Sequence, residues 1–497
     1  MSPAPRPLIH RALRWPFTLG LRQILIVLAL LLGVVRAGVV LMHEPMLAYA
    51  NSFDEVRYTA CFDLYPDRPR EIAPIENSPG APYSRYVFIP LGSETPMCYW
   101  SSELLPQAIV VIAWKISEAL GGSTVHSVRA LGILKFALLL GICVAVTAAW
   151  WRRGFMTRAL ANALLFLLVL TDPANTLYAN TFYAEWTALV AFYATVSCIL
   201  LFADQPLTKW RAIMLACAAL ALGTSKLQHL LLPLLIGIVL IAMVRWRART
   251  WCWPGLVMAA SGLLALSFQV VQANRADPLI ENIRLANAAD VVLMGLLPAS
   301  NDPLQTLARL HIEPACLAWS GRHAWELPNY DPEAVCHGIT HFSRGKEMLV
   351  LLHEPATAVR FAVSGIGEVD SWLAKNLGTI EGGVVDPLPD SIASFGRVLL
   401  AYPILRLILI LFPLVAFAVM LARRNTRPKH MDIALAGIAA TTIAATWGVT
   451  ILGDGLADVA KQCHLVFNAA MGWAVVAATV LIAKSRRAVF LNGAQPV

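Results

Sequence analysis

Four groups of polar residues stand at the ends of long apolar stretches, and their residue types suit acid–base and phosphate chemistry. The first is the adjacent acid pair Asp54 and Glu55, followed by Arg57. Close like charges and partial burial can raise the pKa of one carboxyl and make it a general base. A solvated pair of loop charges explains the same pattern, so the residues alone leave both interpretations open.

The second group runs from Asp172 through Tyr183 to Glu185 and leads from a polar loop into an apolar stretch at 183–203. A carboxylate at membrane depth is costly and tends to face a cavity or a charged partner. This favours a functional role for Glu185 over helix capping or helix pairing.

A short turn between two apolar stretches carries the third group, which contains Lys226, Gln228 and His229. A lysine and a histidine this close to a bilayer can hold a phosphate, the first as a point charge and the second as a hydrogen-bond donor. Snorkelling of Lys226 toward the membrane interface is the alternative interpretation.

The fourth group lies within residues 453–468 and contains Asp454, Asp458, Lys461, His464 and Asn468. Four of them follow the pattern i, i+4, i+7 and i+14, and His464 is one position from i+11. At 3.6 residues per turn, this spacing predicts a single helical face. That face carries charge into the last apolar stretch, where a purely structural role would require a partner for every group.

The elements that must position these groups are membrane helices. Of the 497 residues, 58% are hydrophobic and only 14% are charged, too few charges to cover a soluble domain of this length. The sequence predicts an all-α integral membrane protein with about ten transmembrane helices. They are expected at 21–43, 127–150, 157–171, 183–203, 211–223, 227–244, 252–272, 398–421, 431–452 and 460–483.

The distribution of basic residues predicts the topology. The net charge of +8 is divided among short clusters between apolar stretches, which is typical of cytoplasmic loops and does not indicate nucleic-acid binding. Arginines before the first stretch place the N-terminus inside. The segment 48–50 resembles a signal-peptide cleavage site, but the apolar stretch is long for a signal peptide and ends well before it, so we expect an uncleaved first span.

The remaining basic clusters agree with this topology if the segment 105–120 does not cross the membrane. Lys115 and Glu118 within it favour an interfacial or re-entrant helix. Both termini are then cytoplasmic, and the protein is a multi-pass inner-membrane protein. The clusters that fall inside are 151–158, 204–211, 245–249, 423–430 and 484–487.

Two large segments, 44–126 and 273–397, lie outside under this topology. We therefore expect an N-terminal membrane module at 1–272 that includes the first outer segment with its juxtamembrane helix. A central extracytoplasmic helical segment at 273–397 and a C-terminal membrane module at 398–497 follow. The two outer segments would form a small extracytoplasmic layer.

Four of the nine cysteines fall in these outer segments, two in each. Cys61 and Cys98 belong to the first, and Cys316 and Cys336 to the second. Two outer pairs favour two disulfides and an oxidising compartment over four free thiols. No Cys-x-x-Cys spacing supports a metal site.

All four polar groups fall on the outer side, although none of them was used to derive the topology. They predict an acidic and basic cleft at the outer membrane surface, where an acid activates a hydroxyl and a cation neutralises a phosphate leaving group. Candidate phosphate-binding residues are Arg57, Lys226, His229, Lys461 and His464. The other candidate cleft residues are Asp172, Tyr183, Glu185, Gln228, Asp454, Asp458 and Asn468.

This arrangement resembles the GT-C superfamily of membrane glycosyltransferases. The acid pair Asp54–Glu55, the expected juxtamembrane helix 105–120 and the segments NTFYAEW (180–186), SKLQH (225–229) and GDGLADVAKQCHLVFN (453–468) carry the resemblance. It implies a hexosyl or pentosyl transfer from a polyprenyl-phosphate donor to a cell-surface glycan or glycolipid, usually with inversion. Asp54 is then the expected base, and Glu55 assists it or binds an ion. No Trp-Trp-Asp motif is present, which argues against an oligosaccharyltransferase.

Nothing in the sequence requires a cofactor or a metal. The acidic residues are nevertheless compatible with a bound divalent cation. A transporter or flippase for a lipid-linked glycan is one alternative, but transporters often contain inverted repeats and broken helices, which we do not find. A non-catalytic scaffold of a polysaccharide pathway is another. Phosphoryl transfer would normally call for a clearer metal site. The sequence names neither the sugar nor the acceptor.

Overall fold

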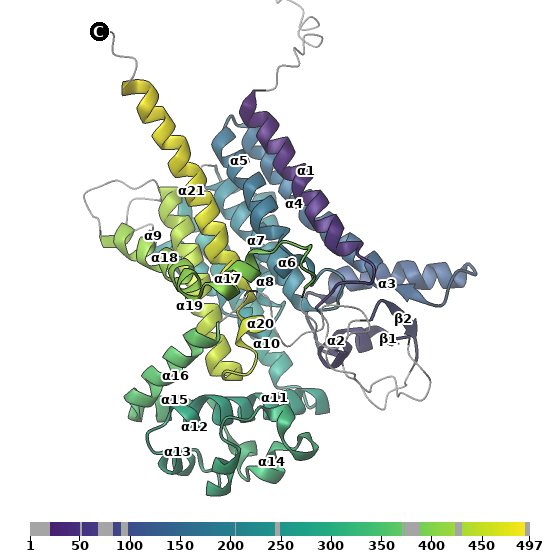
Figure 1. Cartoon of the computed structure of the whole chain (residues 1–497), viewed down its shortest axis with the longest axis vertical. Coiled ribbons are helices and arrows are strands. Elements are labelled where there is room, and N and C mark those ends of the chain that lie inside the picture. Colours follow the sequence, from purple (N-terminus) through teal and green to yellow (C-terminus); the bar gives the residue numbers. More distant parts are fainter. Residues whose placement is uncertain are drawn as a thin grey trace, which may run out of the picture.

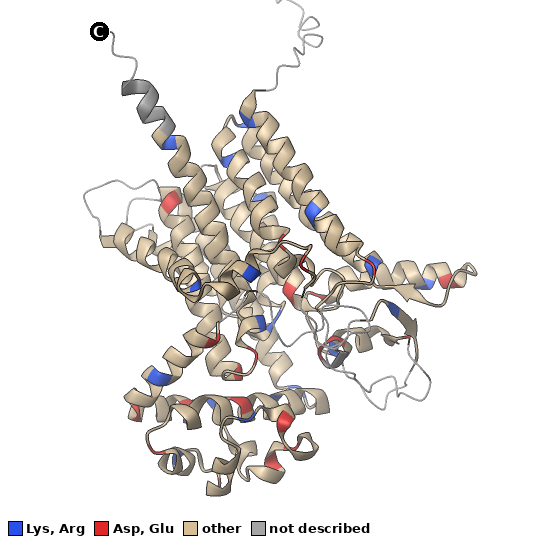
Figure 2. Cartoon of the chain, viewed as in Figure 1, with Lys and Arg blue, Asp and Glu red and all other residues tan. Residues whose placement is uncertain are grey.

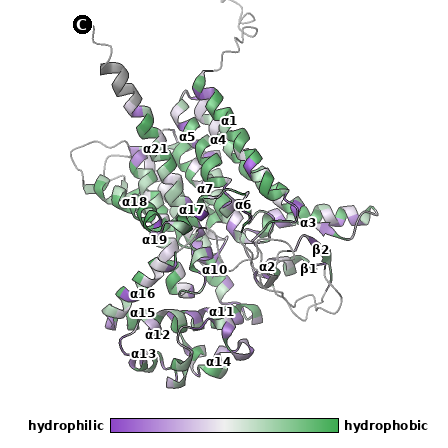
Figure 3. Cartoon of the chain, in the orientation of Figure 1, coloured by the Kyte–Doolittle hydropathy of each residue, from purple (hydrophilic) through white to green (hydrophobic). Residues whose placement is uncertain are grey.

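The computed structural model shows an elongated helix bundle with two smaller layers at one of its ends (Figure 1). Apolar residues dominate the bundle helices, and polar residues are more frequent in the smaller layers (Figure 3). The structure describes residues 20–49, 52–67, 83–90, 98–203, 205–243, 249–369, 372, 388–422 and 430–492.

Seven helices among the described residues are long and apolar enough to cross a membrane, so the protein is an all-α integral membrane protein. Three shorter helical segments complete the bundle: α5 (Met156–Leu165) with the π-turn η4 (Phe166–Leu170), α8 (Lys209–Gly223), and η5 (Leu227–His229) with α9 (Leu232–Met243). Each apolar stretch expected from the sequence is helical. The seven long helices are α1 (Leu21–Leu41), α4 (Arg129–Arg152), α7 (Ala184–Phe202), α10 (Cys252–Ala273), α18 (Pro403–Ala422), α19 (His430–Asp454) and α21 (His464–Asn492).

Small residues let neighbouring helices of the bundle approach closely, as is common where lipid surrounds a protein. Gly237 of α9 and Gly262 of α10 are examples. A Cβ at Gly237 would lie 2.6 Å from the backbone nitrogen of Ala259, and one at Gly262 would lie 2.3 Å from that of Leu234. The pair α9 and α10 therefore packs backbone against backbone.

Arg36 is a charged residue within the long apolar helix α1, and its guanidinium is satisfied inside the protein. It donates to the carbonyl of Leu167, which lies in the π-turn η4, and it pairs with Asp172 at 2.5 Å. It also donates to the carbonyl of Ala393. Burial of an arginine at membrane depth requires such partners, and they join α1 to two distant segments of the chain.

The segment 44–126, which was expected outside and keeps the name first outer segment, contains a small antiparallel sheet that the sequence did not predict. Its strand order is β1–β2–β3, and its first two strands pair Leu64 with Phe88. A disulfide joins Cys61 to Cys98 beside it. The elements are α2 (Ser52–Thr59), η2 (Ala60–Phe62), β1 (Leu64–Pro66), β2 (Arg85–Phe88), α3 (Leu104–Ala119) and β3 (His126–Ser127).

Helix α3, at the expected juxtamembrane position, projects sideways from the bundle (Figure 1). One side of it packs on the sheet and on α4 through residues such as Val110, Val111 and Trp114. An exposed stripe of large apolar side chains runs along another side, as expected for a helix lying in a membrane interface. The stripe consists of Leu105, Ile109, Ile112, Ile116 and Leu120.

The second outer segment folds around a separate hydrophobic core of its own, to which Ile451 of α19 also contributes. A disulfide joins Cys316 to Cys336 within it. Its last two helices are bent by 112° at the break between them and are together apolar enough for a broken span or a re-entrant loop. The elements are α11 (Pro278–Asp290), η8 (Val291–Leu296), α12 (Leu297–Ala299), α13 (Pro303–Leu310), α14 (Pro332–Val335), α15 (Arg344–His353) and α16 (Pro355–Glu368), and four short 3-10 helices lie among them: η9 (Pro314–Trp319), η10 (Ala324–Glu326), η11 (Pro328–Tyr330) and η12 (Ile339–His341).

Candidate functional site

The polar segment 453–468 does not form the single helical face that its spacing predicts. Helix α19 ends at Asp454, a short helix α20 (Val459–Gln462) follows, and α21 begins at His464. Gly455 makes the break, because it has a φ of 62° and a Cβ there would lie 2.4 Å from the carbonyl oxygen of Asp290. The prediction of one continuous stripe is therefore wrong, and tight packing against α11 is the reason.

The break brings α20 against α2, where Lys461 meets Asp54. The Nζ atom of Lys461 lies 2.8 Å from Oδ2 of Asp54 and 2.5 Å from Oδ2 of Asp458. Arg57 pairs with Oδ1 of Asp54 at 2.9 Å, and the hydroxyl of Tyr183 donates to Oδ2 at 3.3 Å. We call Asp54, Arg57, Asp458 and Lys461 the Asp54 network.

The charges of this network set the protonation of its central carboxylate. Burial alone would raise the pKa of Asp54, but Lys461, Arg57 and Lys226 outweigh it and hold the pKa below its ordinary value. Burial alone would likewise lower the pKa of Lys461, and Asp458 and Asp54 raise it instead. Asp54 is thus an ionised carboxylate at neutral pH, and Lys461 is a cation.

A second set of charged and polar residues lies beside the first and is joined to it through α20. Lys226 lies 2.6 Å from Oε1 of Glu185 and donates to Oε1 of Gln462 at 2.7 Å. Gln462 in turn donates to Asp454 at 3.1 Å. We call Glu185, Lys226, Asp454 and Gln462 the Lys226 network. Since Lys461 and Gln462 are consecutive, both networks meet at one end of the bundle.

Glu55 points away from these networks although it is adjacent to Asp54. Its side chain is buried and accepts hydrogen bonds from the Tyr86 hydroxyl and from the backbone N–H of Phe182, both at 3.0 Å. Burial raises the pKa of Glu55 to about 7, against the opposing effect of these hydrogen bonds and of Lys135. The acid pair therefore divides: Asp54 joins the charged network, and Glu55 anchors α2 to the loop before α7.

Three expected site residues lie in other hydrogen-bonded clusters. Asp172 is buried and bonds Arg36, the Ser394 hydroxyl and the backbone N–H of Phe395, so it links three segments of the bundle. Deeper in the bundle, the side chains of His464 and Asn468 both form hydrogen bonds with the side chain of Asn175. The structure does not place these three residues in either network.

The turn before α9 separates Lys226 from its two polar neighbours. His229 is buried and its Nδ1 lies 2.9 Å from the Ser225 hydroxyl. Gln228 is half-buried on η5. Of Lys226, Gln228 and His229, only Lys226 forms a hydrogen bond or ion pair with another member of the networks among the described residues.

One buried ion pair next to the networks was missed by the sequence analysis. Lys135 of α4 lies 2.6 Å from Glu103, and both side chains are at most 1% exposed. Lys135 also donates to the carbonyl of Thr181, and Glu103 accepts from the Thr187 hydroxyl. The pair thus fixes the loop that presents Phe182 to Glu55. The sequence did contain a signal for this pair, because a lysine inside an apolar stretch requires a buried partner.

Asp290 was missed as well, and no local motif marks it. It is buried at the end of α11 and accepts a hydrogen bond from the backbone N–H of Ala324. Burial raises the pKa of Asp290 well above its ordinary value, and Asp454 and Asp458 add to the increase. Among the described residues, no group of three or more His, Cys, Asp or Glu side chains is arranged to hold a metal ion.

The fold and these networks define a multi-pass, all-α membrane protein with a charged site at one end of its helix bundle. Residues 19–343 match the family model of the YfdI N-terminal transmembrane domain, and the chain belongs to this family. The matched region contains Asp54, Glu185 and Lys226 but ends before Lys461. No curated protein and no solved structure matches the chain.

Proposed function

We propose that this protein is a membrane glycosyltransferase of the GT-C type, which moves a sugar from a polyprenyl-phosphate donor to a hydroxyl of a cell-surface glycan or glycolipid. The Asp54 network is the observation that carries the proposal. It combines an ionised carboxylate with cations that suit a phosphate, at one end of a membrane helix bundle.

The reaction assigns a role to each member of the site. Asp54 accepts the proton of the acceptor hydroxyl as its oxygen attacks the anomeric carbon, and the bond from that carbon to the phosphate oxygen breaks. The products are an inverted glycoside and a polyprenyl phosphate. Lys461, Lys226 and Arg57 stabilise the negative charge that develops on the phosphate.

The hydrogen-bond inventory supports this division of roles. A lysine has three N–H donors. Lys226 uses two on Glu185 and Gln462, and Lys461 uses two on Asp54 and Asp458, so among the described residues each retains one donor for a phosphate oxygen. Of the two adjacent acids, Asp54 is in direct contact with Lys461 and Arg57, whereas Glu55 accepts hydrogen bonds from Tyr86 and Phe182, which favours Asp54 as the base.

The charge distribution supports an active site on the extracytoplasmic face. At the bundle end opposite the networks, described basic residues outnumber acidic ones, as expected for a cytoplasmic face, whereas residues of both charges occur in the smaller layers (Figure 2). The basic residues at that opposite end are Arg22, Arg152, Arg153, Arg158, Lys209, Arg211 and Lys484. The two disulfides lie at the other end, in the outer segments, which is consistent with an oxidising compartment.

The direct test measures sugar transfer by the purified full-length protein in liposomes. A panel of polyprenyl-phosphate hexoses and pentoses serves as donors, and membrane glycolipid extracts serve as acceptors. Asp54→Asn should lower the rate about 100-fold or more, which is typical for loss of a general base. Asp63→Asn is the matched control, because Asp63 is exposed on the same outer segment and its left-handed backbone also suits Asn.

The same preparation discriminates the alternatives. A flippase would move the lipid-linked sugar across the bilayer without making a glycoside, and a scaffold would bind partner enzymes equally well with or without Asp54. Absence of both transfer and donor binding across the whole panel would reject the glycosyltransferase.

A further inference from the structure

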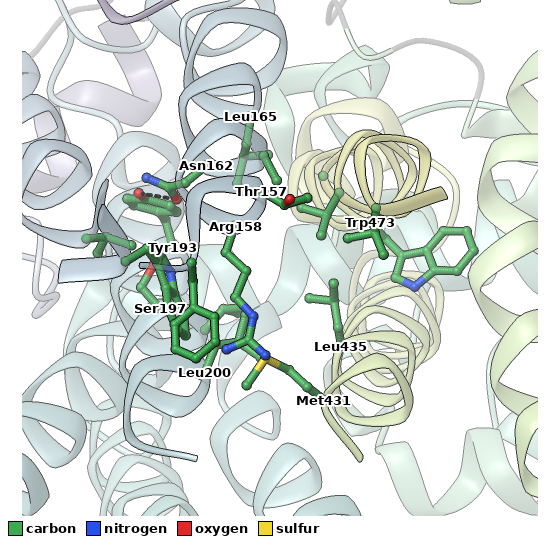
Figure 4. Close-up of a pocket in the computed structure, with 18 of the residues that line it drawn as sticks. Thr157, Arg158, Asn162, Leu165, Tyr193, Ser197, Leu200, Met431, Leu435 and Trp473 are labelled. Atoms are coloured by element: carbon green, nitrogen blue, oxygen red, sulfur yellow. Dashed lines mark hydrogen bonds between the residues drawn. The ribbon is translucent and has the colours of Figure 1, made fainter. Parts of the chain in front are cut away.

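A cavity of about 610 Å³ lies between helices of the bundle (Figure 4). Its lining runs from Arg22 and Lys484 at the basic end to Asn468, and none of the described lining residues belongs to either network. Helices α5 and α7 form one side of it, and α19 and α21 form the other. Its volume is within the ~300–1,000 Å³ range of small-molecule sites. The reaction proposed above uses none of the residues that line its mouth.

The cavity follows one face of α21 for most of the membrane thickness. Asn468, Gly472, Val476, Val480 and Lys484 line it at intervals of four residues. At 1.5 Å per residue, this face is about 24 Å long, compared with ~30 Å for the hydrocarbon core of a bilayer. The cavity therefore has the length and direction of an extended hydrocarbon chain.

Its deeper wall is apolar because the polar groups there bond each other. The Tyr193 hydroxyl donates to Oδ1 of Asn162 at 2.9 Å (Figure 4). The Asn162 amide in turn donates to the Thr147 hydroxyl behind the wall. Leucine, valine and aromatic side chains make up much of the remaining surface. A polar solute would lose its hydration here without gaining equivalent partners.

The mouth of the cavity is basic. Among the described lining residues, Arg22, Arg158 and Lys484 are accompanied by one acid, Asp432, which lies 3.7 Å from Lys484. The guanidinium of Arg158 lies over the Phe155 ring at 4.4 Å, which holds its position. Guanidinium and ammonium groups are the usual ligands of phosphate esters.

We infer that this cavity binds one anionic phospholipid from the membrane leaflet at the basic end of the bundle. An acyl chain extends along α21, and the phosphate is held at the mouth by Arg158 and Lys484. The complementary charge at the mouth selects an anionic headgroup, and the apolar depth selects a hydrocarbon chain. This inference does not depend on the glycosyltransferase activity.

Native mass spectrometry of the delipidated full-length protein tests the headgroup preference. Phosphatidylglycerol should bind one per protein and more tightly than phosphatidylcholine with the same acyl chains. Arg158→Gln and Lys484→Gln should each weaken phosphatidylglycerol binding about fivefold, from the usual contribution of one basic residue near anionic lipid, and leave phosphatidylcholine unchanged. Lys209→Gln and Arg211→Gln are the controls, because both residues lie on α8 at the same end but outside the cavity.

A second variant tests the chain site. Leu435→Trp fills the cavity, whereas Leu263→Trp adds the same bulk at an exposed position of α10. Only Leu435→Trp should reduce the occupancy of both lipids. Equal binding of the two lipids by the wild-type protein, equal losses in the α8 controls, or replacement of phosphatidylglycerol by polyprenyl phosphate at an equimolar ratio would each overturn the inference.

Discussion

Lys461 and Asp54 form a 2.8 Å ion pair although 407 residues separate them in the sequence. The contact joins α2, which follows the first membrane span, to the short helix α20, which precedes the last span. Since Lys461 also binds Asp458, a single ammonium group connects the first outer segment to the C-terminal part of the bundle.

Replacement of Lys461 by Gln should therefore destabilise the protein. Loss of one partner from a buried ion pair leaves uncompensated charge and typically costs about 3–5 kcal/mol. Thermal unfolding in detergent would measure the loss, and Lys461→Arg should recover part of it because the charge returns. An unchanged melting temperature for Lys461→Gln would show that the pair contributes no stability.

Glu55 should make stability depend on pH. Its pKa is raised from 4.5 to about 7 in the folded protein, so the folded state binds its proton more tightly than the unfolded state. The resulting stabilisation, about 3 kcal/mol, is present below pH 4.5 and is lost as the pH rises through 7. The Glu55→Gln side chain cannot titrate. The difference between the wild-type and Glu55→Gln profiles of melting temperature against pH therefore isolates the contribution of Glu55. Parallel profiles would contradict the assignment.

The buried pair Glu103–Lys135 should show strong energetic coupling. Lys135→Met alone leaves a buried carboxylate without its cation and should cost about 3–5 kcal/mol, whereas Lys135→Met combined with Glu103→Leu should recover much of the loss. A double-mutant cycle of thermal unfolding measures the coupling. Additive effects of the two substitutions would mean that the pair does not act as a unit.

The Cys61–Cys98 disulfide should stabilise the first outer segment. It closes a loop of 37 residues, for which the chain-entropy relation gives about 3–4 kcal/mol. The double variant Cys61→Ser with Cys98→Ser should unfold at a lower temperature than the wild-type protein. A reductant should lower the melting temperature of this variant less than that of the wild-type protein. Cys316→Ser with Cys336→Ser serves as the comparison for the second outer segment.

Membrane-impermeant thiol labelling of intact cells tests the proposed topology. In a variant whose five free cysteines are replaced by Ala, Asn301→Cys should react from outside because residue 301 is exposed in the second outer segment. Lys209→Cys, exposed at the basic end, should react only after the membrane is opened. The opposite pattern would place the networks on the cytoplasmic side.

Local sequence patterns were enough to predict the apolar helices and to single out several residues that the structure brings into the two networks. Seven of the ten apolar stretches contain helices that are long and apolar enough to cross a membrane. Such a stretch favours a helix because only a helix satisfies its own backbone hydrogen bonds within one segment. Asp54, Glu185, Lys226 and Lys461 stood out since a charge beside or within such a run is costly. These inferences need no knowledge of which helices are neighbours.

Tertiary structure alone decided which of these charges meet. The break at Gly455 depends on contact with Asp290, so helical periodicity could not foresee that Lys461 turns toward Asp54 while Asn468 turns toward Asn175. Two adjacent acids likewise received opposite environments, because a helix directs neighbouring side chains about 100° apart. Spacing along the chain specifies faces of single helices, whereas the partners of a buried charge are set by packing between segments hundreds of residues apart.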